Sequence, residues 1–112
     1  MFSPDDKIDS LSGGNKQKVL VSRLLNYKLK VYLFDEVTEG IDIGARKALL
    51  KFIREVISKE SVVLTASNVV ADLLDICDRI FVMFHGEIIE SFEKIDFNEH
   101  DIYSSLQGLR LA

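Results

Sequence analysis

The stretch that decides the fold of this 112-residue chain is Leu11-Ser12-Gly13-Gly14-Asn15-Lys16-Gln17-Lys18, followed by Val31-Tyr32-Leu33-Phe34-Asp35-Glu36. Glycines that lead into a helix let a phosphate approach the unpaired N–H groups of the first turn. An apolar run that ends in two carboxylates is typical of a strand in a parallel sheet, with acidic side chains at its carboxyl end. Together the two stretches predict parts of a nucleoside-triphosphate site.

The residues around these stretches predict alternating helices and strands. We expect a helix from Ser12 to about Asn26, a strand over 31–34, a helix over about 43–59 capped by Asp42, and a second buried strand over 62–65. A helix whose inner stripe runs from Val70 to Cys77 should follow. The chain should then form a hairpin of 80–84 and 87–91 around His85-Gly86, and a short last helix capped by Asn98 and ending near Gly108. The continuous apolar strands are of the kind buried on both faces. The order predicts an α/β fold with a parallel sheet.

Composition narrows the class of protein. The chain is 47% hydrophobic and 29% charged, which predicts one compact unit over residues 1–112. The net charge of −4 comes without a basic run, which argues against DNA or RNA as the main ligand. No apolar stretch approaches the roughly 20 residues of a membrane span. The start of the chain lacks the pattern of a secretory signal and Cys77 stands alone, so we expect a cytoplasmic location.

One part of a triphosphate site is missing from the sequence. The six glycines are Gly13, Gly14, Gly40, Gly44, Gly86 and Gly108, and none lies in a Gly-x-x-x-x-Gly-Lys-Ser/Thr loop. The chain therefore reads as the downstream half of an ATPase, without its own phosphate loop.

Leu11 to Lys18 resembles the signature motif of ATP-binding cassette (ABC) transporter ATPases, in the form typical of sugar importers of the ribose and galactose type. Val31 to Glu36 resembles the Walker B strand with its catalytic glutamate, and Glu39 to Arg46 resembles the D-loop. Cys77 to Ile88 is similar to the strand pair after the switch loop. The resemblance runs from about Ile8 to Glu90 and points to the C-terminal part of a second cassette. It implies a partial P-loop NTPase fold that lacks the Walker A strand and loop.

The resemblance also assigns roles, with ATP and Mg²⁺ as cofactors. Asp35 would hold Mg²⁺ through water, Glu36 would polarise the attacking water, and Asn68 occupies the switch position near the γ-phosphate. The remaining expected nucleotide contacts are Leu11, Ser12, Gly13, Gly14 and Gln17, with Asp42 helping to join two sites.

The family implies that two cassettes pack head to tail, with each ATP between the phosphate loop of one and the signature helix of the other. The implied partners are a second cassette, membrane permease subunits and, indirectly, a sugar-binding protein. The implied location is peripheral, at the inner face of the cell membrane. Three residues depart from the family pattern: Val37 stands in place of Pro, Glu39 in place of Arg, and Asn68 in place of the usual His or Ser.

Two interpretations of the function remain open. In the first, the chain is the catalytic C-terminal part of a sugar-importer ATPase that couples ATP hydrolysis to carbohydrate uptake, with the phosphate loop on sequence not included here. In the second, it is a non-catalytic truncated module that supplies a signature helix in trans or only self-associates. Both predict that the isolated chain self-associates and does not hydrolyse ATP. Chromosome-maintenance ATPases share the glycine and Asp-Glu motifs. Cys77 to Met83 and the hairpin at Gly86 resemble the transporter form instead, and the sequence shows no heptads or basic surface.

Overall fold

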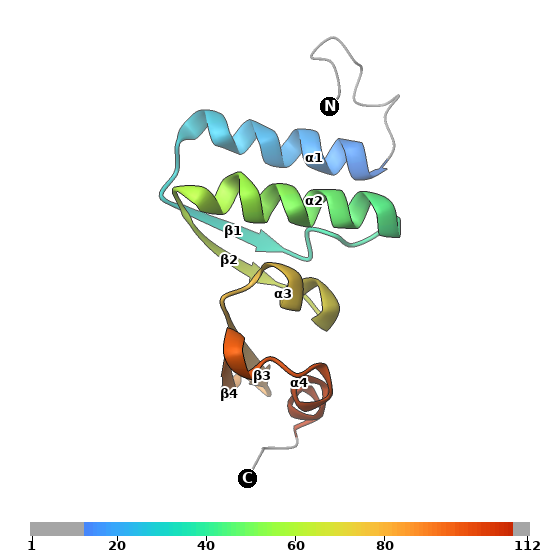
Figure 1. Ribbon diagram of the computed structural model, residues 1–112, viewed down its shortest axis with the longest axis vertical. Helices are drawn as coiled ribbons and strands as arrows, with labels where there is room; N and C mark the ends of the chain where they lie inside the picture. Colours follow the sequence, from blue (N-terminus) through green and yellow to red (C-terminus); the bar gives the residue numbers. More distant parts are fainter. Residues whose placement is uncertain (1–12, 109–112) are drawn as a thin grey trace. The chain divides into compact units, whose positions relative to one another are not determined.

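The computed structural model describes residues 13–108, with side chains from residue 16 onward, and Figure 1 shows their elements. The chain divides into two compact units, one up to Ala66 and one from Ser67. Each unit has its own cluster of buried apolar side chains. None of the helices within residues 13–108 is long and apolar enough to cross a bilayer.

The first unit contains a parallel strand pair and the helices that pack on it. Its elements are α1 (Gly13–Leu24), the 3-10 turn η2 (Leu25–Tyr27), β1 (Val31–Asp35), α2 (Ile43–Glu55), the 3-10 turn η3 (Ile57–Lys59) and β2 (Val62–Ala66). β1 pairs with β2 in parallel, from Val31 opposite Val62 to Asp35 opposite Ala66. The predicted parallel sheet and alternating order are confirmed. The predicted helix over 43–59 is shorter, because its α-helical part ends at Glu55 and a 3-10 turn completes it.

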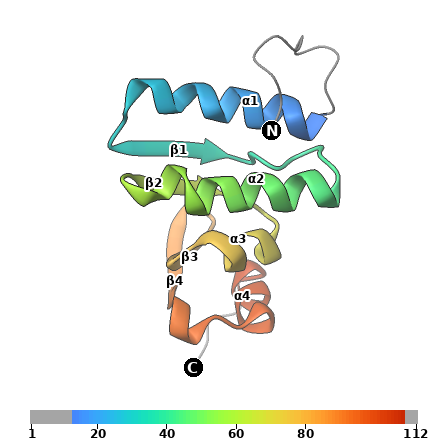
Figure 2. The ribbon, with the colours of Figure 1, turned by 45° about the horizontal axis from the view of Figure 1, so that its top comes forward.

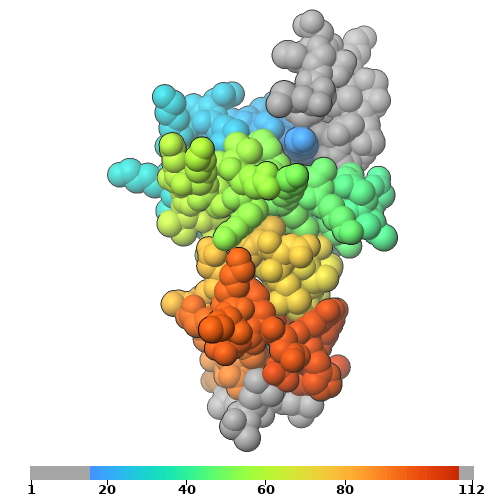
Figure 3. All heavy atoms as spheres, in the orientation of Figure 1, coloured from blue at the N-terminus to red at the C-terminus, as the bar shows by residue number. Residues whose placement is uncertain are grey.

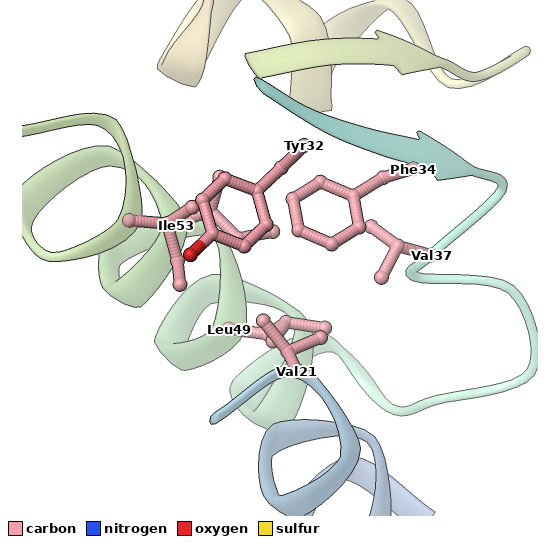
Figure 4. Close-up of a cluster of buried hydrophobic side chains, with 7 residues drawn as sticks. Val21, Tyr32, Phe34, Val37, Leu49 and Ile53 are labelled. Atoms are coloured by element: carbon pink, nitrogen blue, oxygen red, sulfur yellow. The ribbon is translucent and has the colours of Figure 1, made fainter. Parts of the chain in front are cut away.

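One face of this strand pair carries the core of the first unit. Tyr32 and Phe34 project from β1 with their rings 6.3 Å apart and nearly parallel, as alternate residues of a strand must lie on one face. They meet Val21 from α1 and Leu49 and Ile53 from α2, all at most 7% exposed (Figure 4). In two views the helices run along the length of β1 (Figures 1 and 2), and the atoms of α1 and α2 lie against one another in Figure 3. Both helices therefore cover the same face.

The opposite face of the strand pair is exposed, contrary to the prediction that these strands are buried on both faces. Its side chains are Val31 (52% exposed), Leu33 (71%), Val62 (65%) and Leu64 (61%), and we call these four the apolar sheet face. Their alternation with Tyr32 and Phe34 gives β1 a one-sided burial pattern. The physical reason is that α1 and α2 both lie on the Tyr32 side, and no element described here covers the other. Leu20 of α1 is also 49% exposed.

The second unit is built on a β-hairpin. Its elements are α3 (Val70–Ile76), β3 (Arg79–Phe84), β4 (Glu87–Glu93), the 3-10 turn η4 (Lys94–Asp96) and α4 (Glu99–Leu106). Phe84 pairs with Glu87 across a two-residue turn, in which His85 and Gly86 both have positive φ, at 50° and 80°. Such values at both central residues match the right-handed twist of the flanking strands. The predicted hairpin and its turn are confirmed.

The packing and caps of the second unit also follow the prediction. Its core consists of Val70, Ile80, Val82, Phe92 and Ile102, with Leu73, Leu74 and Cys77 packed against it. Asn98 caps α4 through its Oδ1, which accepts from the Asp101 N–H at 3.1 Å. Gly108 follows the helix with φ +85°, and a Cβ there would lie 2.7 Å from the Phe84 ring. Only glycine suits this position, both for its backbone angle and for its contact with the ring.

Candidate functional site

Asp35, predicted to hold Mg²⁺, and Glu36, predicted to be catalytic, lie at the carboxyl end of the parallel strand pair. Asp35 is the last residue of β1 and is exposed, while Glu36 follows it and is partly buried. The Glu36 N–H donates to the carbonyl of Ala66, the last residue of β2, at 2.9 Å. This bond extends the parallel pairing by one step and ties the start of the following turn to the sheet. In open α/β sheets, ligands bind beyond this end of the strands.

Glu36 adopts an uncommon backbone conformation. Its φ is 50°, in the left-handed region, where a non-glycine residue costs about 1–2 kcal/mol relative to the right-handed helical region. Its carbonyl accepts from the Glu39 N–H at 3.0 Å, which closes a tight turn after the strand. Strained backbone persists where surrounding contacts hold it, and it occurs frequently at functional sites. The sequence motif gave no indication of this conformation.

The residues after Glu36 are anchored in the core. Val37 is 9% exposed and belongs to the same buried cluster as Val21, while Thr38 is 2% exposed. The side-chain nitrogen of Gln17 in α1 donates to the Val37 carbonyl at 2.9 Å. The helix that begins at the glycines is therefore joined directly to the turn that carries Glu36. Sequence reasoning missed this contact, although Gln17 lies one helical turn before the buried Val21 and so on the same side of the helix.

The expected phosphate-contacting segment is described only in part. Leu11 and Ser12 lie outside the described residues. Gly13 is the first residue of α1 and Gly14 the second, so both lie in its first turn as predicted. The N–H groups of a first turn have no partners within their helix, which is the feature that binds anions. A nucleotide contact by these glycines stays a prediction.

Asp42 serves as the cap of α2. Its Oδ1 accepts from the Ala45 N–H at 2.8 Å, as the predicted capping role requires. The residue is exposed, and Gly40, two positions before it, has φ +79° with open space around its missing Cβ. The expected role of Asp42 in joining two sites stays a prediction.

Asn68 lies between β2 and α3, at the start of the second unit, and is exposed. In the same short connection, the Ser67 hydroxyl oxygen accepts from the Val69 N–H at 3.0 Å. This bond shapes the turn from which Asn68 projects. A contact between Asn68 and a γ-phosphate stays a prediction.

Comparison with known proteins finds relatives of this chain. No family model matches it, but individual proteins do. The ribose import ATP-binding protein RbsA 1 of Burkholderia thailandensis is 38% identical over 86 residues, which are 77% of this chain and 17% of that protein. The arabinose import ATP-binding protein AraG of Rhizobium meliloti is 37% identical over 99 residues, 88% of this chain and 20% of that protein.

A solved structure agrees with these relatives. The ADP conformation of MJ1267, an ATP-binding cassette of an ABC transporter, has a TM-score of 0.70 and 26% identity, with 88% of this chain and 37% of that one covered. This chain belongs to the ABC ATPase family. The predicted partial cassette fold is thereby confirmed. The chain spans about a fifth of the length of the curated relatives it matches, and 37% of the ABC cassette.

The carboxylates at this end of the sheet are groups that could hold Mg²⁺. Within residues 13–108, no three side chains of His, Cys, Asp or Glu gather as a protein-built metal site. Mg²⁺ needs no such cluster, because it keeps several waters and is held by one or two carboxylates together with substrate phosphates. An exposed carboxylate at a strand end, as at Asp35, meets that requirement.

Proposed function

We propose that this chain is the part of an ABC sugar-import ATPase that carries the signature helix and the water-polarising carboxylate, in a system that couples ATP hydrolysis to carbohydrate uptake. One observation supports this most strongly. The helix that begins at Gly13 and the turn that carries Glu36 belong to one folded unit, and the Gln17–Val37 hydrogen bond joins them. The matched relatives are named as ribose and arabinose import ATP-binding proteins, which supports a sugar as the transported class.

Each residue has a proposed task. Glu36 accepts a proton from, and so orients, the water that attacks the γ-phosphate, as a general base in phosphoryl transfer does. Asp35 would hold Mg²⁺ through water, and the bound ion would neutralise part of the phosphate charge. Gly13 and Gly14 would offer the first-turn N–H groups of α1 to a phosphate. The 112 residues contain no Gly-x-x-x-x-Gly-Lys-Ser/Thr loop, so in this proposal the loop would lie on sequence outside them.

The proposed assembly follows from this division of the site. The partners are a second cassette, membrane permease subunits and, through them, a sugar-binding protein. The chain would act at the inner face of the cell membrane without crossing it. Closure of the cassettes on ATP, and their opening after hydrolysis, would drive the permease.

A hybrid protein tests the proposal. In RbsA 1 of Burkholderia thailandensis, the stretch that matches this chain is replaced by the chain's own residues. We expect the hybrid to bind ATP and to hydrolyse it within about tenfold of the parent rate, because the chain's carboxylates and signature helix then meet the rest of an ATPase. A folded hybrid that binds ATP but shows no hydrolysis would overturn the proposal.

One observation, the apolar sheet face, supports the self-association of the isolated chain that both interpretations predict. Four neighbouring apolar side chains at 52–71% exposure are unusual on a protein that acts alone. We expect the isolated chain to self-associate at about 100 μM. Its double variant Leu33→Lys/Leu64→Glu should associate at least about tenfold more weakly, because burying one leucine contributes about 1.5–3 kcal/mol.

The two positions are direct cross-strand partners, so the introduced opposite charges leave the strand pairing intact. Sedimentation velocity over a concentration series measures the association. Leu20→Lys, which adds a charge at an exposed leucine of α1, is the matched control and should leave association unchanged. Unmodified chain that sediments as a monomer throughout the series would contradict the prediction.

A further inference from the structure

The side chain of Gln17 connects α1 to the turn after β1. The Gln17 Nε2 donates to the Val37 carbonyl at 2.9 Å, across 20 positions of sequence. A carbonyl oxygen only accepts, so the atom of Gln17 that faces it must be the amide nitrogen. One turn further along α1, Val21 is 4% exposed and packs in the buried cluster that also contains Val37. A hydrogen bond to Val37 and the buried cluster that Val21 shares with it therefore fix α1 against this turn.

The backbone around Glu36 is held on both sides. Its N–H is fixed to β2 through Ala66, and its carbonyl accepts from Glu39. Beyond it, Gln17 fixes the next carbonyl, that of Val37. Since Glu36 has φ 50°, the turn would relax toward commoner backbone angles if these bonds were weakened. Two of the bonds are local or part of the sheet, whereas the Gln17 bond comes from the helix that begins at the glycines.

We infer that Gln17 is a positioning residue: through the Val37 carbonyl it holds the Glu36 backbone in its left-handed conformation, so that the signature helix sets the direction of the Glu36 carboxylate. The importance of that direction rests on the proposed function, but the positioning itself does not. Gln17 was predicted from its motif as a nucleotide contact. That contact stays a prediction; in this structure the side-chain nitrogen of Gln17 donates within its own unit, to a carbonyl of the turn that carries Glu36.

Hydrogen exchange and NMR of the 112-residue chain, without nucleotide, test the inference. In Gln17→Leu we expect the Glu39 amide to exchange about fivefold faster, because the loss of one hydrogen bond of ordinary net strength makes opening of the turn more favourable by about that factor. The coupling between the amide and α protons of Glu36 and its Cα shift report φ, and both should move toward averaged values. Amides of α2 should keep their protection, which separates loss of positioning from general unfolding.

Matched controls come from the same chain. Ser22→Ala removes another side-chain bond of α1, from the Ser22 hydroxyl to the Lys18 carbonyl at 2.7 Å, and should leave Glu36 and Glu39 unchanged. Gln17→Glu keeps the size of the side chain but points an acceptor at the carbonyl, so it should act in the same direction as Gln17→Leu. Unchanged exchange at Glu39 and unchanged Glu36 signals in both Gln17 variants would overturn the inference.

A measurement on the unmodified chain covers the case in which the variants do not fold. The side-chain amide protons of Gln17 should exchange at least about fivefold more slowly than those of the exposed Gln107. Equal exchange at the two glutamines would overturn the inference. Because none of these readouts needs ATP, their failure is distinguishable from an inactive hybrid protein, which would count against the proposed function alone.

Discussion

In the hybrid protein, Glu36→Gln is expected to lower the rate of ATP hydrolysis by about 10²- to 10⁴-fold, which is the typical contribution of a positioned general base. Glutamine has nearly the same size as glutamate but accepts no proton, so ATP should bind as before. Steady-state kinetics gives kcat, and calorimetry gives the ATP affinity. The combination of lost turnover and retained binding is the result that a water-polarising role requires.

Glu39→Gln is the matched control for this prediction. It makes the same chemical change three positions further on, at an exposed carboxylate in the same turn. We expect it to keep turnover within about threefold, because an exposed charge outside the reacting centre contributes little. Full turnover in Glu36→Gln would show that another group orients the water.

Leu49→Ala is expected to lower the free energy of unfolding of the first unit by about 3 kcal/mol. Leu49 is 1% exposed and meets Tyr32, Phe34 and Ile53 in the centre of the core (Figure 4). Truncation would leave a cavity in addition to the lost transfer free energy of the side chain. Urea unfolding followed by circular dichroism measures the change, with hydrogen exchange to assign the transition to the first unit.

The control for Leu49→Ala lies in the same helix. Ile43 is 69% exposed, so Ile43→Ala should change the free energy of unfolding by less than about 0.5 kcal/mol. Because the two units have separate cores, Leu49→Ala should leave the protection of amides in β3 and β4 unchanged. Equal effects of the two substitutions, or an equal loss of protection in both units, would contradict the prediction.

The features that the sequence predicted well are local ones. Asp42 and Asn98 cap helices because their side chains reach an N–H only three residues away, and His85-Gly86 forms a turn because the two residues tolerate positive φ. The placement of Asp35 and Glu36 at the carboxyl end of a parallel strand was predictable for a similar reason. A continuous apolar run determines the strand, and its end determines the position of the carboxylates.

The features that the sequence did not predict depend on distant partners. An apolar residue such as Leu33 predicts burial, but burial requires another element on that face, and the described residues provide none. The Gln17–Val37 bond joins residues 20 positions apart, and no periodicity specifies which side chain a carbonyl will meet. The left-handed φ of Glu36 is likewise set by the bonds around it, because glutamate has no intrinsic preference for that region.

The parallel pairing of β1 with β2 also has a kinetic consequence. Each pair joins residues about 30 positions apart, with the whole of α2 between them. Closing so long a loop costs conformational entropy, and this cost arises before the strand contacts form and compensate for it. Helical turns in α1 and α2 form on a much shorter timescale. Strand association should therefore be a late step when this unit folds, guided by a helical segment that has already formed.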